Sequence, residues 1–174
     1  MEKNRLLKEN LMSDDAIKDA LRLMPYGFYS ITSRNGDEVN AMVANWLTQV
    51  SFEPRQVALG LQKTSYSYGL ITAGKVFAIN IFYKADVESM KPFTKSRAKN
   101  PEKMVNAQYT AGPETGCPIL EGAAAYLECR VVSSLDSGGD HEIIVGEVVG
   151  ATVLKPGSVA DAVTLVDLGW SYAG

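Results

Sequence analysis

The chain has 174 residues, a hydrophobic fraction of 46% and a formal net charge of −3, which suit one soluble domain with a proper core. An acidic balance without any cluster of Lys and Arg excludes nucleic acid as the main partner, because a phosphate backbone requires a basic surface. No apolar run approaches the roughly 18 residues of a membrane helix, and residues 1–10 lack the features of a signal or transit peptide. We therefore expect a cytoplasmic protein without membrane contact, with an N-terminal extension over residues 1–12 and one domain over residues 13–174.

The cysteine and histidine content argues against metal chemistry. Cys117 and Cys129 are too far apart for a CxxC motif, and in a reducing compartment both are expected to be free thiols. His141 is the only histidine in the chain, which excludes a site with several histidine ligands. We predict no metal site.

The first predicted element is an amphipathic helix. Ser13 can cap it, and apolar residues between positions 16 and 24 recur at helical spacing. Pro25 and Gly27 end the pattern. We expect this helix to cover a barrel or sheet.

From residue 27 onward the sequence has the pattern of short strands. Asn35-Gly36-Asp37 is a strong hairpin turn between the first two of them. Residues 65–72, between the third and fourth strands, predict a short helix or turn. The predicted strands cover residues 28–32, 39–44, 56–61, 76–82, 124–135, 141–154 and 163–168.

Residues 84–118 lose the β pattern. They are rich in Lys, Pro, Met and Asn, and they predict a short helix over residues 87–93 followed by an excursion. An insertion of this length in a compact domain is often a functional lid. Its lysines suit an anionic substrate and equally suit a solvated face, so both interpretations stay open.

Many short strands, hairpin turns, one leading helix and no βαβ alternation predict a mainly β protein built on a closed antiparallel barrel. The strand over residues 141–154 carries apolar residues on both faces, whereas a barrel strand needs to bury only one. Its second face must meet a helix or another subunit. We therefore predict a homodimer.

Two polar segments are candidate binding sites. Residues 40–54 interleave apolar residues with Asn45, Trp46 and Thr48, which suits either a ligand-facing stretch or a half-exposed strand. Residues 62–67 place Lys63 and several hydroxyl groups where a strand runs into a helix. Such a helix start can hold one phosphate, and ordinary helix capping explains the hydroxyls equally well.

Two nucleotide-binding motifs are absent or incomplete. Residues 69–76 nearly match a P-loop, but Val76 stands where the motif needs Ser or Thr, and a strand follows instead of a helix. No GxGxxG motif occurs, which argues against a Rossmann site.

Six further segments are each weak alone but specific as a set in their order and spacing. They are residues 20–27 (ALRLMPYG), 45–54 (NWLTQVSFEP), 74–80 (GKVFAIN), 116–118 (GCP), 125–131 (AYLECRV) and 139–148, which contain GDH followed by IVGEV. With this set, residues 13 to about 155 resemble the flavin-reductase-like family of FMN-binding split barrels.

The resemblance implies a Greek-key-type antiparallel split barrel with a leading helix and a short helical insertion. It also implies a homodimer that holds FMN (or FAD) noncovalently near the subunit interface and uses NAD(P)H as co-substrate. Residues matching 45–51 would lie along the flavin ring, those matching 62–67 would meet the ribityl chain and phosphate, and residue 80 would close the pocket. The implied cofactor-binding residues are Asn45, Trp46, Leu47, Thr48, Gln62, Lys63, Ser65, Ser67 and Asn80.

Trp46 departs from the family pattern, in which smaller residues such as Ser or Thr are common, so ring stacking is expected to differ here. His141 follows Asp140 after a Gly-rich turn and is the one side chain that titrates near neutral pH. It could orient the nicotinamide, as the family suggests, or be a turn residue that caps the barrel.

The first functional hypothesis is an NAD(P)H-dependent flavin reductase that passes electrons to free flavin, a ferric complex or a partner protein such as a monooxygenase. A flavin carries the redox chemistry itself, which agrees with a chain that has no catalytic triad or carboxylate pair. The alternative is a non-catalytic FMN electron carrier that another redox protein reduces. A third hypothesis is a structural barrel with a degenerate site.

Overall fold

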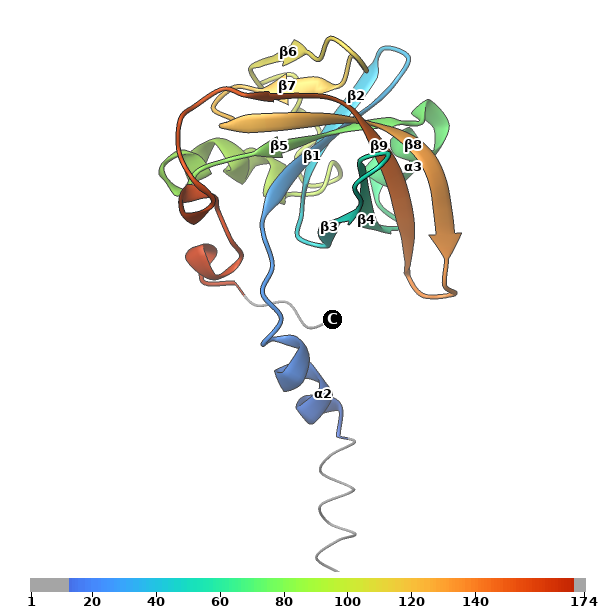
Figure 1. The fold of residues 1–174 in the computed structure, drawn as a ribbon, viewed down its shortest axis with the longest axis vertical. Helices are drawn as coiled ribbons and strands as arrows, with labels where there is room; N and C mark the ends of the chain where they lie inside the picture. The colour runs from blue at the N-terminus through green and yellow to red at the C-terminus, as the bar shows by residue number, and fades with distance from the viewer. Residues whose placement is uncertain (1–12, 171–174) are drawn as a thin grey trace, which may run out of the picture.

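The structure, a computed structural model, describes residues 13–170. Its main feature is a seven-stranded antiparallel sheet with strand order β2-β1-β5-β8-β9-β4-β3, and a small hairpin of β6 and β7 lies at one side (Figure 1). The strands are β1 (Tyr29–Asn35), β2 (Glu38–Ala44), β3 (Leu47–Ser51), β4 (Gln56–Gln62), β5 (Val76–Ile81), β6 (Tyr109–Ala111), β7 (Pro118–Leu120), β8 (Ala125–Asp136) and β9 (His141–Val153).

The sheet is rolled into a barrel that stays open along one line. Its two outer strands, β2 and β3, are consecutive in the chain, and only Asn45 and Trp46 separate them. Two residues cannot cross a flat seven-stranded sheet, so its edges must curl toward each other. Because β2 and β3 form no ladder with each other, the barrel is split at this point. The predicted split-barrel fold is confirmed.

Two apolar clusters hold the fold together. The cluster inside the barrel consists of Ile31, Val57, Leu59, Leu61, Ile71, Phe77, Ile79, Cys129 and Ile144. In β4 the inward residues alternate along the strand, as a sheet with one buried face requires. The second cluster includes Phe28, Phe82, Met90, Phe93 and Met104. It fixes the 3-10 helix η1 (Lys84–Thr94) and the turns that follow it against the barrel.

Helix α3 (Tyr66–Gly74) packs against β1 and β2. Ser65 caps its first turn and accepts a hydrogen bond of 3.2 Å from the backbone N–H of Tyr68. The predicted short helix is therefore present where β4 ends.

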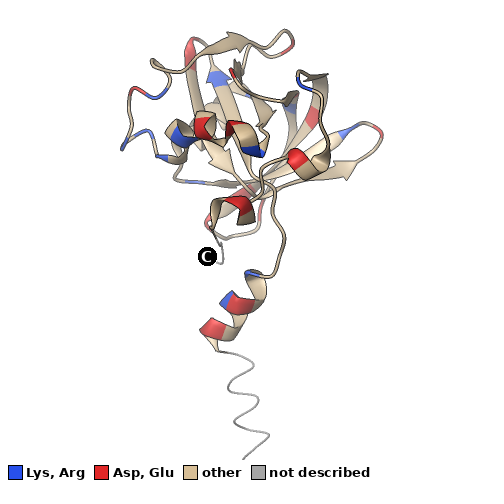
Figure 2. Ribbon diagram, turned by 90° about the vertical axis from the view of Figure 1, so that its left-hand side faces the viewer, with Lys and Arg blue, Asp and Glu red and all other residues tan. Residues whose placement is uncertain are grey.

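Helix α2 (Asp14–Leu21) begins at the predicted cap, since the Ser13 hydroxyl accepts a hydrogen bond from the Ala16 N–H. The expectation that it covers the barrel is wrong. None of its residues is buried, and it projects away from the barrel with charges of both signs along it (Figures 1 and 2). Ile17 and Leu21, on its apolar face, are exposed.

The predicted strand over residues 163–168 is also wrong. The segment makes only an isolated bridge between Gly27 and Thr164 and then forms the 3-10 helix η3 (Val166–Leu168). The Asp167 carboxylate accepts hydrogen bonds from both the backbone N–H and the hydroxyl of Thr164. This local side-chain bonding favours a turn over a strand.

The other predicted turns and helices are present, with small shifts in their bounds. The Asn35-Gly36-Asp37 turn joins β1 and β2, with Gly36 at φ 59°. The excursion contains η1 where a helix was expected, and it also contributes β6 and β7, which were not predicted. Within residues 13–170, no helix is long and apolar enough to cross a membrane.

Candidate active site

A cavity of about 210 Å³ opens at the split between β2 and β3, and we call it the slot. Asn45 and Trp46, the two linking residues, line it together with Gly60 of β4 and His141 of β9. Phe28 and Trp170 line it as well. Their rings form an edge-on pair with centroids 5.6 Å apart.

A second cavity of about 650 Å³ continues from the slot, and we call it the cationic cavity. The two share Met42, Val43, Gln62 and Ser65 along their common side. The cationic cavity then follows the start of α3 and reaches residues 93–98 and Lys103. The slot and the cationic cavity thus form one groove with an aromatic end and a basic end.

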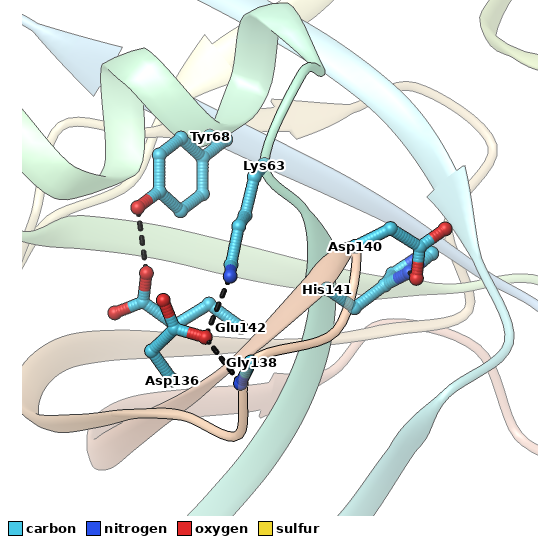
Figure 3. Close-up of polar contacts among 7 residues, drawn as sticks. All are labelled: Lys63, Tyr68, Asp136, Gly138, Asp140, His141 and Glu142. Atoms are coloured by element: carbon cyan, nitrogen blue, oxygen red, sulfur yellow. Dashed lines mark hydrogen bonds and ion pairs between the residues drawn. The ribbon is translucent and has the colours of Figure 1, made fainter.

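At the aromatic end, the rings of Trp46 and His141 touch, with centroids 4.6 Å apart and planes tilted by 57°. The His141 Nδ1 lies 2.8 Å from an Asp140 carboxylate oxygen (Figure 3). This hydrogen bond lowers the pKa of Asp140 and holds the imidazole. The Asn45 amide nitrogen is buried and has no hydrogen-bond partner among the residues that the structure describes.

At the basic end, Lys103 is only 3% exposed. Its ammonium donates a hydrogen bond of 2.9 Å to the Lys95 carbonyl, and no carboxylate within residues 13–170 forms an ion pair with it. Burial, together with the charge of Arg97, lowers the pKa of Lys103 to about 8. The Arg97 guanidinium stacks over the Tyr66 ring, 4.5 Å from its centroid. A buried cation without a counter-ion favours an anionic ligand.

The start of α3 forms the wall between the two ends. Ser67 is buried, and its hydroxyl accepts a hydrogen bond of 2.8 Å from the Asn40 amide. The Asn40 side-chain carbonyl is buried and has no partner in the described part of the chain. Ser65 caps the helix, so the capping interpretation of its hydroxyl is correct, although the residue also lines the groove.

The structure brings six predicted site residues to the groove, which are Asn45, Trp46, Gln62, Ser65, Ser67 and His141. Leu47 and Thr48 do not line either cavity. Leu47 packs against the cluster inside the barrel, and Thr48 is exposed on β3.

Lys63, predicted to meet the flavin phosphate, does not line either cavity. Its ammonium lies 2.6 Å from the Asp136 carboxylate, because the β8–β9 hairpin folds back over the end of β4 (Figure 3). This contact and the Gly138 N–H lower the pKa of Asp136. Beside it, the Tyr68 hydroxyl donates a hydrogen bond of 2.6 Å to Glu142.

Asn80, predicted to close the pocket, does not line either cavity. It is fully buried in β5, where its side-chain oxygen accepts a hydrogen bond of 2.8 Å from the Leu120 N–H. Its amide faces the Pro118 carbonyl and the Thr32 hydroxyl. Asn80 therefore ties β5 to β1 and β7 and does not reach the groove.

Sequence reasoning missed Arg97 and Lys103 as site residues. The lysine-rich composition of residues 84–118 was noted, but composition does not distinguish a buried lysine from a solvated one. Both cysteines are free and buried, as expected. Burial raises the pKa of Cys117 to about 11 and that of Cys129 to about 12, so neither is a ready nucleophile.

Comparison with known proteins gives the family of this split barrel. The sequence model of the flavin reductase like domain matches residues 21–168. The chain belongs to this family, as its sequence segments indicated.

Among curated relatives, the NADH-dependent FAD reductase of Streptomyces globisporus is 32% identical over 71% of this chain and 68% of its own length. Diflavin flavoprotein A 1 of Synechocystis sp. is 30% identical over 86% of this chain, but over only 26% of its own length. The chain therefore spans about a quarter of the diflavin flavoproteins that it matches.

Solved structures agree with the family. The NADH:FAD oxidoreductase SgcE6 of Streptomyces globisporus has a TM-score of 0.72 and 28% identity, covering 82% of this chain and 84% of its own. That protein has also been solved with NAD and FAD fragments. The flavin reductase HpaC, solved with NADP+, has a TM-score of 0.72 and 26% identity, covering 84% and 90% of the two chains.

Proposed function

We propose that the chain binds FMN, or the equivalent half of FAD, in the groove and catalyses its reduction by NAD(P)H. One observation carries the proposal: an aromatic slot lies at one end of a continuous groove, and a buried lysine with no ion pair within residues 13–170 lies at the other. A flavin nucleotide has the matching parts, with a flat apolar ring system at one end and a phosphate at the other.

The basic end would hold the phosphate. Lys103 and Arg97 supply two cations there, and the first turn of α3 adds backbone N–H groups and the positive end of its dipole. Phosphate contacts with buried cations are charge-assisted and strong. Lys103 thus takes the role that the sequence had suggested for Lys63.

The aromatic end would hold the ring. The unpaired Asn45 amide can donate a hydrogen bond to a ring carbonyl, and the unpaired Asn40 carbonyl can accept one from the ribityl chain. A bound flavin supplies the redox chemistry by taking up a hydride and releasing its electrons to an acceptor. The protein needs only to bind, orient and shield it.

His141 would meet the nicotinamide. Its Nδ1 is engaged by Asp140, which leaves Nε2 available for the carboxamide. The names of the relatives support this co-substrate, since they include an NADH-dependent FAD reductase and a flavin reductase solved with NADP+.

The proposal includes a homodimer. Exposed apolar side chains occur at the β3–β4 turn, in Val50 and Phe52, and on β8 and β9, in Leu135 and Ile143. Phe52 is 86% exposed. A second copy that covers this surface would shield it from water.

A second candidate function is an electron carrier. The similarity to a quarter of the diflavin flavoproteins supports it, because there the matching segment is one part of a longer protein that carries more than one flavin. In that role the bound flavin would exchange electrons with a partner flavoprotein or monooxygenase.

A steady-state assay tests the proposed function. NADH or NADPH consumption is followed at 340 nm with FMN, FAD or riboflavin as acceptor and with a ferric chelate added in parallel. Turnover that depends on added flavin supports the reductase. Tight flavin binding without turnover would instead support the carrier, and no flavin binding would overturn both.

A further inference from the structure

The β8–β9 hairpin carries His141 to the slot. His141 is the first residue of β9, and it pairs with Gln62 of β4, which lines both the slot and the cationic cavity. Residues 136–140, which form the tip of the hairpin just before His141, are exposed and include two glycines. Because an exposed turn of this kind has little packing of its own, the position of His141 depends on the contacts that fix the tip.

Lys63 contacts both ends of this tip. Its backbone N–H donates a hydrogen bond of 3.0 Å to the Asp140 carbonyl, and its ammonium lies 2.6 Å from the Asp136 carboxylate (Figure 3). The same carboxylate oxygen accepts a hydrogen bond of 2.7 Å from the Gly138 N–H inside the tip. We call the two contacts of Lys63 the clamp. They join the start and the end of the tip to one residue directly after β4.

The carboxylates around the clamp lie on the face of β9 away from the slot. Glu142 follows His141 by one residue, so the two side chains point to opposite faces of the strand. Asp136 pairs with Glu142 in the β8–β9 register, and the Tyr68 hydroxyl donates a hydrogen bond of 2.6 Å to Glu142 (Figure 3). The clamp therefore acts on the backbone that carries His141 and not on the imidazole itself.

The imidazole has its own contacts on the slot side. Its Nδ1 lies 2.8 Å from the Asp140 carboxylate, and its ring touches the Trp46 indole with centroids 4.6 Å apart. Asp140 is also the residue whose carbonyl accepts the Lys63 hydrogen bond. A movement of the tip would therefore displace the imidazole together with the carboxylate that orients it.

We propose that Lys63 is a positioning residue for the nicotinamide step, because the clamp keeps His141 and Asp140 at the slot; this rests on the proposed function. Without the ion pair the tip takes up other positions, and only molecules with His141 at the slot offer the nicotinamide its contact. The apparent affinity for NAD(P)H falls in proportion to that fraction of molecules. Flavin affinity does not change, since Lys63 lies outside both cavities.

The first test measures KM and kcat for NADH at saturating FMN. Lys63→Met and Asp136→Asn should each raise KM by about two- to fivefold and leave kcat close to the wild type, as the strength of one exposed ion pair allows. Lys63→Arg keeps the cation and should stay close to the wild type.

The matched control is Lys155→Met. Lys155 forms an ion pair of 2.9 Å with Asp86, its side chain is 37% exposed against 28% for Lys63, and it lines neither the slot nor the cationic cavity. Loss of this pair should leave KM for NADH unchanged, since it does not hold the hairpin.

A double variant shows whether Lys63 acts through His141. Two residues that serve one contact are not additive when both are changed. Lys63→Met should therefore raise KM in the wild-type background and raise it no further in the His141→Ala background. An independent contact between Lys63 and the nicotinamide would give the same increase in both.

A second readout needs neither flavin nor turnover. His141 is the only histidine in the chain, so in the untagged protein its ring protons give NMR signals that need no assignment. The neighbouring indole shifts these signals by its ring current. In Lys63→Met and Asp136→Asn they should move toward the positions of a free histidine, and in Lys63→Arg and Lys155→Met they should stay. Asp136 is exposed, so Asp136→Asn gives the same test if Lys63→Met does not fold.

Three results would overturn the inference: His141 signals that stay in place when the ion pair is removed, signals that move without any rise in KM, or a rise in KM that persists undiminished in the His141→Ala background. The proposed function fails separately, if the wild type binds or reduces no flavin. The NMR signals then still show whether the clamp holds the imidazole.

Discussion

The ammonium group of Lys63 lies 2.6 Å from the carboxylate of Asp136, at the tip of the β8–β9 hairpin and outside the groove. Lys103, which is forty residues further along the chain, is buried at the groove's basic end instead. We propose that Lys103, and not Lys63, meets the flavin phosphate, and this assignment can be tested directly.

Lys103→Met should weaken FMN binding by about ten- to a hundredfold, because a hydrogen bond to a charged group contributes about 1.5–3 kcal/mol. Riboflavin, which lacks the phosphate, should bind the variant and the wild type alike. Lys63→Met is the matched control, and its FMN affinity should stay within about twofold of the wild type. Fluorescence titrations with FMN and with riboflavin give the flavin affinities of the wild type and the two variants. A larger loss of FMN affinity in Lys63→Met than in Lys103→Met would show that Lys63, and not Lys103, binds the phosphate.

FMN affinity should depend on pH through Lys103. Its pKa in the flavin-free protein is about 8, because burial disfavours the charged form. A bound phosphate favours the ammonium and raises this pKa in the complex. Affinity should therefore be full below pH 8 and fall as the pH rises above it, and Lys103→Met should remove this decline. Titrations between pH 7 and 9.5 check the sign, and an affinity that rises over this range would contradict it.

His141→Ala should raise the KM for NADH by up to about tenfold, the value of one lost hydrogen bond, and leave FMN binding unchanged. Asp140→Asn should act in the same direction with a smaller effect, since Asp140 only holds the imidazole. Steady-state kinetics at saturating FMN measure both variants. An unaltered KM in His141→Ala would make this residue a cap of the barrel.

Asn80→Leu should destabilise the fold without touching the site. It leaves the buried Leu120 N–H without its partner, at a cost of about 1–3 kcal/mol. Urea unfolding gives the change in stability, and FMN titration of the folded variant should match the wild type. A selective loss of FMN affinity at normal stability would restore Asn80 to the pocket.

Phe52→Glu should turn a dimer into a monomer, because it places a charge on the exposed apolar surface that Val50 and Phe52 form at the β3–β4 turn. Val159→Glu is the control, since Val159 is 92% exposed in the 3-10 helix η2 (Val159–Asp161), outside that surface. Sedimentation velocity distinguishes the outcomes. A wild-type monomer, or a dimer unaffected by Phe52→Glu, would rule out this interface.

Features that depend on neighbouring residues could be read from the sequence. The Asn35-Gly36-Asp37 turn and the Ser13 cap are local chemistry, and both are present. The strand predicted at residues 163–168 is wrong, and its cause is also a local contact. The Asp167 side chain accepts hydrogen bonds from Thr164, and this bonding competes with strand formation.

Structural features that depend on contacts between residues far apart in the chain could not be predicted from the sequence. The Lys63 ammonium meets a carboxylate that the β8–β9 hairpin delivers, and Lys103 is buried because η1 and the turns after it pack against the barrel. Neither contact changes the local pattern of apolar and polar residues from which the elements were predicted. Five of the residues that line the slot were predicted, from the polar pattern and the family resemblance together: Asn45, Trp46, Gln62, Ser65 and His141.

The most direct test of the account is one anaerobic absorbance experiment. FMN is added to the purified protein in a one-to-one ratio, unbound flavin is removed, and a slight excess of NADH or NADPH is mixed in. The account predicts flavin bands that stay with the protein and bleach within seconds. Bound flavin that keeps its colour with both nicotinamides would contradict a nicotinamide-linked reductase.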